Sequence, residues 1–274
     1  NTAGIVNTMD SFIPCAYECG YEEIKRGSIA LVAQTGMVGP EAMPWHEFSY
    51  GINKVIDLGN KCDVDESDVL EYLGDDPSIK VIALYLEGVK NGPRFLRIAK
   101  EVVRKKPVLV LKSGRIEEGA RAAASHTGSL AANDRVFDSA CRQAGIIRIA
   151  KWSELLDFAK ILAYQPLPKG NRLGIISPSG GTAAMMTDMA SEYGLTMATL
   201  STESSENLTK LFPPAWGANP VDLGPPIAHR PDDWFYLYEK ALEIFLSDEN
   251  VDCIANTMAV EWRGSLLEPY IKYA

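Results

Sequence analysis

Residues 28–39 have the sequence SIALVAQTGMVG, and this stretch predicts the fold class. Ser28 to Ala33 is a short run rich in strand-forming residues, a pattern typical of a strand that is buried on both faces. The small-residue turn Gln34-Thr35-Gly36 follows it, and we expect a helix from about Val38 to Tyr50. A buried strand, a glycine-containing turn and a helix together form the repeating unit of a parallel α/β sheet.

The same unit recurs four more times along the chain. The later strands are expected at residues 54–58, 81–86, 108–111 and 146–149, and the helices at 66–73, 93–105, 131–144 and 152–163. Strands that alternate with helices predict a doubly wound parallel sheet, which we assign to residues 27–168. Pro166, Pro168 and Gly170 then indicate a linker.

After the linker the pattern starts again, with strands expected at 173–176, 195–200 and 253–255 and a helix at 180–193. Pro178-Ser179-Gly180 is the counterpart of Gln34-Thr35-Gly36, and NPVD at 219–222 resembles NKCDVD at 60–65, which indicates an internal duplication. We therefore expect a second domain of the same doubly wound α/β class at residues 169–274. This domain is expected to be incomplete, and residues 1–26 are expected to be a remnant or linker from a preceding domain.

The composition of the 274 residues is that of a globular protein, with 46% hydrophobic residues and a net charge of -9. An acidic chain argues against nucleic acid or an anionic membrane as a partner. The five scattered cysteines favour reduced thiols and a cytoplasmic location. Only Cys15 and Cys19 lie close together, and no second pair completes a zinc site, so no metal site is expected on this chain.

Ligands of an open parallel sheet bind beyond the carboxyl ends of its strands, where the strand order reverses. Two of the loops expected there carry candidate site residues. The turn Thr35-Gly36-Met37 precedes a helix, and it is either a phosphate-binding helix start or a tight turn. Glu87 directly follows the strand at 81–86, and it either orients a neighbouring base or is a solvated loop acid.

The third loop, residues 112–130, has the sequence KSGRIEEGARAAASHTGSL and contains His126. A connection of this length is uncommon in a compact domain and is usually functional or disordered. The small or hydroxyl-bearing neighbours Ser125, Thr127 and Gly128 allow a partner to approach the imidazole closely. A neutral imidazole is a competent nucleophile when a carboxylate holds its other nitrogen, and Glu87 is the acid placed to do so.

Other charged residues and histidines have simpler interpretations. His46 is interpreted as a packed residue of a helix, and His229 as a surface residue. Lys112, Arg115 and Arg121 either attract phosphate or CoA or belong to a solvated loop that nearby glutamates balance.

Five segments together carry a resemblance to a known family. They are LGNKCDVDESDVLEYLGDDP, VIALYLEG, LKSGR, SHTGSLA and NPVDLG, which lie between residues 58 and 224, and the likeness covers essentially the whole chain. The chain resembles the α subunit of the NDP-forming acyl-CoA synthetases, which include ADP-forming acetate–CoA ligase and are similar to succinyl-CoA synthetase. The resemblance implies two succinyl-CoA synthetase-like flavodoxin domains in tandem. Asp222 lies in one of these motifs, and for it we favour a structural cap or turn.

The resemblance also implies a reaction, in which acyl-CoA, phosphate and a nucleoside diphosphate reversibly give the free acid, CoA and the triphosphate. An acyl phosphate forms, and its phosphoryl group passes to a histidine and then to the diphosphate. His126 matches that histidine, and Glu87 matches the acid that steadies it. The family holds the phosphohistidine between two helix starts. The matching residues are Thr35, Gly36 and Met37 in the first domain and Ser179, Gly180 and Gly181 in the second, with Ser125, Thr127 and Gly128 supporting the loop.

The cofactors and partners that the resemblance implies belong to the complete enzyme. They are CoA, phosphate, and ATP or ADP with Mg²⁺, with nucleotide and metal on an ATP-grasp module that is either a β subunit or a fused domain. A CoA-binding domain, a small carboxylic acid or its acyl-CoA, and an oligomeric assembly complete the set. The segment alone is not expected to run the full cycle. The alternatives are a non-catalytic or regulatory paralogue that binds CoA-type ligands or a partner, and a flavin carrier of similar topology.

Overall fold

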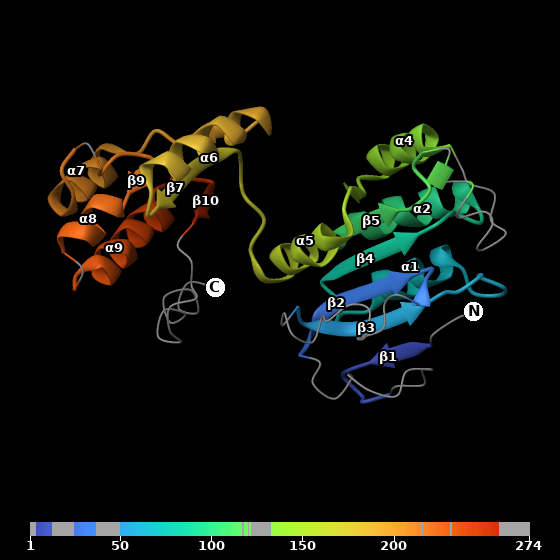
Figure 1. Ribbon diagram of the computed structural model, residues 1–274. Helices are drawn as coiled ribbons and strands as arrows, with labels where there is room; N and C mark the ends of the chain where they lie inside the picture. The colour runs from blue at the N-terminus through green and yellow to red at the C-terminus, as the bar shows by residue number, and fades with distance from the viewer. Residues whose placement is uncertain are drawn as a thin grey trace. The chain divides into compact units, whose positions relative to one another are not determined.

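A computed structural model describes residues 4–12, 25–36, 50–116, 118, 119, 121, 133–214, 216–230 and 232–257. The chain divides into two compact units, Asn1–Gln165 and Pro166–Ala274. Each unit has its own sheet and its own helices (Figure 1). The two units are therefore described one at a time.

The first unit contains a six-stranded sheet in its described part. Its strands are β1 (Ile5–Asn7), β2 (Arg26–Ala33), β3 (Ile52–Asp57), β4 (Val81–Leu86), β5 (Val108–Lys112) and β6 (Ile147–Ile149). The spatial order is β1-β3-β2-β4-β5-β6. Neighbouring strands run parallel except for β1, which pairs with β3 in antiparallel fashion at the edge of the sheet.

Helices cover both faces of this sheet, as a doubly wound fold requires (Figure 1). One apolar cluster packs one face against α1 (Glu66–Asp75), α2 (Gly92–Val103) and α4 (Asp134–Ala144), and a second cluster packs the other face against α5 (Trp152–Tyr164). Leu84 and Leu86 of β4 belong to the first cluster, while Ala83 belongs to the second. The uninterrupted apolar run of β4 is thus explained by burial on both faces.

The α/β fold class expected from the sequence is confirmed, and the described strands and helices of the first unit lie close to their expected positions. The helix expected at residues 38–50 lies outside the described residues apart from its end. Residues 1–26 were expected to be a remnant or linker before the first domain. The structure nonetheless pairs Ile5–Asn7 with β3, Val6 lying opposite Val55, so part of this segment belongs to the sheet.

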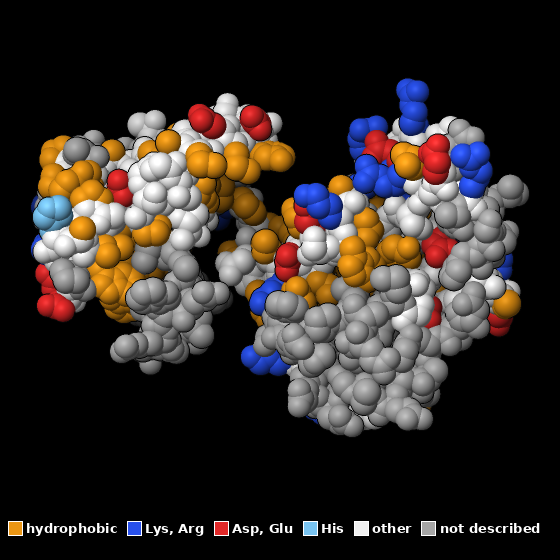
Figure 2. Space-filling model, viewed as in Figure 1, with side chains coloured by type: hydrophobic (Ala, Val, Ile, Leu, Met, Phe, Trp, Pro, Cys, Tyr) orange, Lys and Arg blue, Asp and Glu red, His pale blue; other side chains and the backbone are white. Residues whose placement is uncertain are grey.

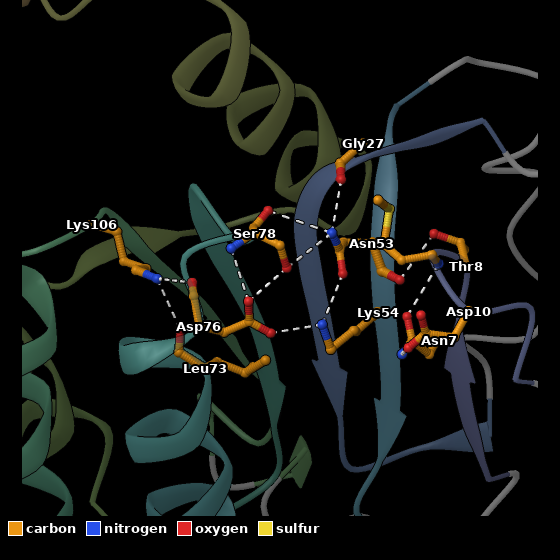
Figure 3. A network of polar contacts seen from close by, with 11 residues as sticks. Asn7, Thr8, Asp10, Gly27, Asn53, Lys54, Leu73, Asp76, Ser78 and Lys106 are labelled. Atoms are coloured by element: carbon orange, nitrogen blue, oxygen red, sulfur yellow. Dashed lines mark hydrogen bonds and ion pairs between the residues drawn. The ribbon is translucent and has the colours of Figure 1, made fainter.

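A network of polar contacts joins the amino ends of the strands in the first unit (Figure 3). The Asn53 amide donates to the carbonyl oxygens of Gly27, at 3.0 Å, and Ser78, at 3.4 Å. Lys54 Nζ lies 2.9 Å from Asn53 Oδ1 and 2.7 Å from Asp76 Oδ2. The network therefore links the starts of β2 and β3 to the turn that follows α1.

The second unit is built on a smaller parallel sheet. Its strands are β7 (Arg172–Ser177), β8 (Thr196–Met197), β9 (Val221–Asp222) and β10 (Cys253–Asn256), and its helices are α6 (Gly180–Glu192), α7 (Thr202–Leu211), α8 (Gly224–His229) and α9 (Trp234–Ser247). β7 is central, with β10 on one side and both β8 and β9 paired to it. The strand expected at 195–200 is only two residues long, and α7, α8 and α9 fall in a span that the sequence patterns left unassigned.

Charged side chains of both signs gather over α4 (Figure 2). Arg142 pairs with Asp138 at 2.6 Å, and Arg148 forms ion pairs with Asp134 and Asp138. The guanidinium groups of Arg142 and Arg148 are therefore paired with neighbouring carboxylates. No helix in the described ranges has both the length and the apolar character that crossing a membrane needs.

Candidate functional site

The strand order of the first unit reverses at β2. The chain passes from β2 to β3 on one side and then crosses over to β4 on the other side. In an open α/β sheet a ligand binds at the carboxyl edge beside such a switch point. The residues that follow β2 and β4, Gln34 to Gly36 and Glu87 to Gly88, therefore occupy the position where a site is expected.

Glu87 is buried at this edge, with only 7% of its surface exposed. Its Oε2 atom is inaccessible to solvent and has no hydrogen-bond partner among the described residues. A buried polar atom without a partner is costly and calls for an explanation, and a partner group that binds there is one. The alternative of a solvated loop acid is therefore wrong for Glu87. His126, the partner that the sequence suggests, lies outside the described residues.

The backbone of Glu87 is held by the turn after β2. Gln34 Oε1 accepts hydrogen bonds from the backbone N–H of Glu87, at 3.1 Å, and of Gly88, at 3.3 Å. The backbone N–H of Gln34 in turn donates to the carbonyl oxygen of Tyr85 at 3.0 Å. Thr35 and Gly36 follow directly and are half-buried, so these two candidate phosphate-binding residues begin next to the Glu87 loop. Met37 lies outside the described residues.

The end of β5 adds two further polar side chains to the same edge. Leu86 pairs with Lys112, and these residues end β4 and β5, so Glu87 and Ser113 are the first residues after two neighbouring strands. The Ser113 Oγ atom is also buried and has no partner within the described part of the chain. Lys112 is 1% exposed, and its Nζ donates to the carbonyl oxygen of Ser113 at 2.9 Å. Burial lowers the pKa of Lys112, and its interpretation as a solvated loop residue is wrong.

In the second unit, Ser179, Gly180 and Gly181 are exposed at the start of α6. Ser179 Oγ accepts a hydrogen bond from the backbone N–H of Thr182 at 3.4 Å and so acts as the N-cap. A Cβ atom on Gly180 would lie 2.6 Å from Asp222 Oδ2, so a larger residue at this position would have to displace the Asp222 carboxylate. The first turn of this 13-residue helix is exposed to solvent.

Asp222 has the structural role that the sequence favoured. Its Oδ1 atom accepts a hydrogen bond from the backbone N–H of Gly224 at 2.9 Å, which is the geometry of an Asx turn. Asp222 ends β9, opposite Ser177 of β7. Because its carboxylate also lies beside Gly180, it complements the positive end of the α6 dipole.

The remaining candidates are described only in part. His229 lies on the surface, where its Nδ1 is 2.7 Å from the carbonyl oxygen of Pro225. The placements of His46, Ser125, Thr127 and Gly128 lie outside the described residues. Throughout the described ranges, no group of three or more His, Cys, Asp or Glu side chains is arranged to hold a metal ion.

Sequence patterns did not identify three buried side chains that belong to this edge of the sheet. They are Gln34, which was noted only as part of the turn, Lys61, which was quoted only within sequence motifs, and Glu66, which was noted only in a family motif and as the start of the helix expected at 66–73. Lys61, in the loop between β3 and α1, forms an ion pair of 2.8 Å with Glu66, the first residue of α1. Lysine and glutamate side chains are ordinarily solvated, so nothing in a spacing of five residues indicated burial.

The first unit matches one family of known proteins. Residues 26–162 match the family described as succinyl-CoA ligase-like flavodoxin domains, and the chain belongs to this family. The resemblance found in the sequence motifs is thereby confirmed.

Two curated relatives and one solved structure have names that specify an activity. The chain is 36% identical over 271 residues to acetate–CoA ligase [ADP-forming] II of Archaeoglobus fulgidus, covering 97% of this chain and 39% of the relative. It is 38% identical over 270 residues to the α subunit of acetate–CoA ligase [ADP-forming] II of Pyrococcus furiosus, covering 94% of this chain and 56% of that subunit.

The solved structure is acetyl-coenzyme A synthetase 1 of Ca. Korarchaeum cryptofilum, described as dinucleotide forming and in complex with phosphate and ADP. It superposes with a TM-score of 0.85 at 31% identity, covering 99% of this chain and 58% of that one. The chain thus spans about half the length of the proteins that it matches.

Proposed function

We propose that this chain is the portion of an ADP-forming acyl-CoA synthetase, an acid–thiol ligase, that relays a phosphoryl group through His126. The observation that carries the proposal is the buried Glu87 Oε2 atom, which lies at the switch point without a partner in the described part of the chain. The ADP-forming relatives support the reaction class. Because the chain spans only about half of them, the activity of the whole enzyme is part of the proposal.

In the proposed step, one ring nitrogen of His126 attacks the phosphorus atom of an acyl phosphate. An N–P bond forms, the P–O bond to the acyl group breaks, and the carboxylate leaves with the electron pair. Glu87 accepts the N–H of the other ring nitrogen, which fixes the tautomer and stabilises positive charge on the ring. In the second step the phosphoryl group passes from nitrogen to a diphosphate oxygen, and the neutral imidazole is regenerated.

The phosphoryl group on the imidazole carries about two negative charges at neutral pH. We propose that backbone N–H groups of Thr35, Gly36 and Met37, and those of Ser179, Gly180 and Gly181 at the start of α6, are donors to this anion. A helix terminus stabilises an anion by about 0.3–1 kcal/mol when exposed and by up to about 2 kcal/mol when partly buried. Stabilisation of this size favours the phosphorylated state without preventing transfer in either direction.

The remaining parts of the reaction are assigned to other modules of the complete enzyme. We propose a CoA-binding domain, an ATP-grasp β subunit or fused domain that binds ATP or ADP with Mg²⁺, and a small carboxylic acid as the acyl group. The α-subunit name of one relative supports a separate partner, and the phosphate and ADP named for the solved structure support those two ligands. An oligomer in the cytoplasm is part of the same proposal.

The test is to incubate the complete enzyme with ATP labelled at the γ-phosphate. We expect the chain to acquire a label that is labile in acid and stable in alkali. His126→Ala should abolish the label, while the matched control His229→Ala, at an exposed histidine of the second unit, should retain it. Full labelling of His126→Ala would remove the assignment, and an enzyme that binds CoA without any labelling would favour the regulatory alternative.

A further inference from the structure

A buried ion pair joins the loop that follows β3 to the first residue of α1, at the carboxyl edge that carries Glu87. The side chains of Lys61 and Glu66 are 6% and 0% exposed, and Lys61 Nζ is 2.8 Å from Glu66 Oε2. Lys61 also has a backbone φ of 56°, in the left-handed region that a residue with a side chain seldom adopts. A buried charge pair and a strained backbone both oppose folding, so their presence needs an explanation.

The hydrogen bonds of this pair lead to the loop that begins with Glu87. Lys61 Nζ donates to the carbonyl oxygen of Gly88 at 2.7 Å, and Glu66 Oε1 accepts from the backbone N–H of Lys90 at 2.7 Å. Lys90 Nζ returns the contact by donating to the carbonyl oxygen of Lys61 at 2.9 Å. Two charged side chains, one from the loop after β3 and one from the first residue of α1, therefore hold two backbone positions of the loop after β4.

Gln34 holds the same loop from the side of β2. It is 4% exposed, and its Oε1 atom accepts from the backbone N–H groups of both Glu87 and Gly88. Side chains that follow two adjacent strands thus fix residues 87, 88 and 90, which follow a third strand. The hydrogen bonds of Gln34 are neutral, whereas those of Lys61 and Glu66, both of 2.7 Å, are charge-assisted and therefore stronger.

We propose that Gln34, Lys61 and Glu66 are positioning residues for phosphoryl transfer, which aim the Glu87 carboxylate at the imidazole of His126. This inference rests on the proposed function. A carboxylate that orients a base must be held in one direction, and Glu87 Oε2 has no hydrogen bond of its own among the described residues to hold it. The direction is set instead by the backbone that these three side chains clamp.

The chain offers a matched control for the loss of a buried ion pair. Lys54 and Asp76 form a pair of 2.7 Å at the opposite, amino edge of the same sheet, with side chains 10% and 14% exposed (Figure 3). Replacing a buried pair by apolar residues of similar volume is often neutral for stability. The double variants K61M/E66M and K54M/D76M therefore remove the same kind of interaction from the two edges.

The experiment measures single-turnover label transfer to the chain in the complete enzyme, in each double variant, with and without Glu87→Gln. We expect K61M/E66M to slow transfer about 10- to 100-fold with the KM for CoA unchanged, and K54M/D76M to leave the transfer rate as in the wild type. We also expect Glu87→Gln to cost the wild type about 10- to 100-fold but to cost K61M/E66M less than about 3-fold, because residues that act as a unit are not additive.

Two results separate this inference from the function on which it rests. If Glu87→Gln slows transfer but K61M/E66M does not, or if the two effects multiply in the combined variant, the positioning role is wrong and the proposed function stands. If neither Glu87→Gln nor His126→Ala affects transfer, the proposed function itself fails.

A second pair of variants covers the case in which K61M/E66M does not fold. Gln34→Met removes the acceptor for the N–H groups of Glu87 and Gly88, while Gln34→Glu keeps an acceptor oxygen at the same reach. We expect Gln34→Met to slow transfer about 10-fold or more and Gln34→Glu to recover the greater part of the rate. Equal rates in Gln34→Met and the wild type would overturn the inference.

Discussion

Glu87 combines two properties that seldom occur together in a stable fold, because its carboxylate is buried and one of its oxygens has no partner in the described residues. An unpaired buried carboxylate opposes folding, whereas the same group is useful where it meets an imidazole. The burial of Glu87 is therefore better explained by a role in a site than by a role in the core. Its position beside Ser113, whose hydroxyl is also buried without a described partner, supports the same conclusion.

The role of Glu87 leads to a kinetic prediction. Glu87→Gln keeps the size of the side chain but removes the negative charge that stabilises a charged imidazole. We expect label transfer to fall about 10- to 100-fold, the range typical of groups that orient a reacting residue. Rapid-quench measurements of the labelled chain check this, with Glu101→Gln on the exposed side of α2 as the control. Unchanged transfer kinetics in Glu87→Gln would rule the role out.

Cysteine reactivity gives a second prediction at the residue scale. Burial raises the pKa of the Cys141 thiol to about 11, while Cys62 is exposed. Because the thiolate is the reactive form, a pKa raised by about two units lowers the thiolate fraction about 100-fold. We expect iodoacetamide at pH 8 to alkylate Cys62 and spare Cys141, as peptide mass spectrometry can show. Urea should abolish the difference, and equal rates in the folded protein would contradict the burial.

At the scale of elements, α1 shows how sequence sets a boundary near the site. The Asp65 side chain accepts from the backbone N–H groups of Ser67, at 2.8 Å, and Asp68, at 3.2 Å. Asp68 Oδ2 in turn accepts from the N–H of Asp65 at 2.9 Å, which completes a capping box. The cap fixes where α1 starts and hence the position of Glu66, its first residue.

Loss of this cap has a calculable effect on stability. We expect Asp65→Ala to lower the free energy of unfolding by about 1–2 kcal/mol, because two N–H groups at the helix start lose their acceptor. Urea denaturation followed by circular dichroism measures the change. The neighbouring Asp63→Ala, at an exposed position, should change it by less than about 0.5 kcal/mol. Similar losses in the two variants would contradict the capping role.

The elements that the sequence predicted correctly share one physical property. β2, β4 and β5 are continuous apolar runs because both faces of their sheet are covered, and such runs are visible without any tertiary information. β9, with two residues, is too short to show a period. The clamp of Gln34 on Glu87 joins residues 53 positions apart, so it follows from strand order and not from a local pattern.

At the scale of the first unit, the amino edge of the sheet carries a pH-dependent contribution to stability. Burial alone would raise the pKa of Asp76, but hydrogen bonds from Lys54 and Ser78 outweigh it and lower the pKa to about 2. A carboxyl group whose pKa is lower in the folded state stabilises that state above its unfolded pKa. The contribution is lost as the pH falls through the folded value.

We therefore expect the stability advantage of the wild type over Asp76→Asn to shrink by about 2 kcal/mol between about pH 5 and pH 2. Urea denaturation at a series of pH values measures this difference. Asp63→Asn, which removes an exposed carboxyl group, is the control and should show a much smaller change. An advantage that stays constant down to pH 2 would contradict the ion pair as the cause.

For the whole chain, the sequence motifs correctly identified the family. The apolar pattern, which locates the strands, correctly identified the fold class. The helices of the second unit were harder to predict. In chain order α7, α8 and α9 lie between β8 and β10, and in this span the repeating unit of strand, glycine turn and helix does not recur. The buried state of Lys112 could not be predicted either. It depends on Phe137, whose ring lies 5.8 Å from Lys112 Nζ and comes from a distant helix.

The most direct test of the account is to locate the phosphate by mass spectrometry of the labelled chain, with digestion at neutral or alkaline pH. Trypsin releases residues 122–135, a peptide with a single histidine, His126. We expect the phosphate to lie on that histidine, and we expect Glu87→Gln to reduce the rate at which the phosphorylated peptide appears. A phosphate found on any other residue, or a chain that turns over acyl-CoA without a phosphorylated form of this peptide, would contradict the account.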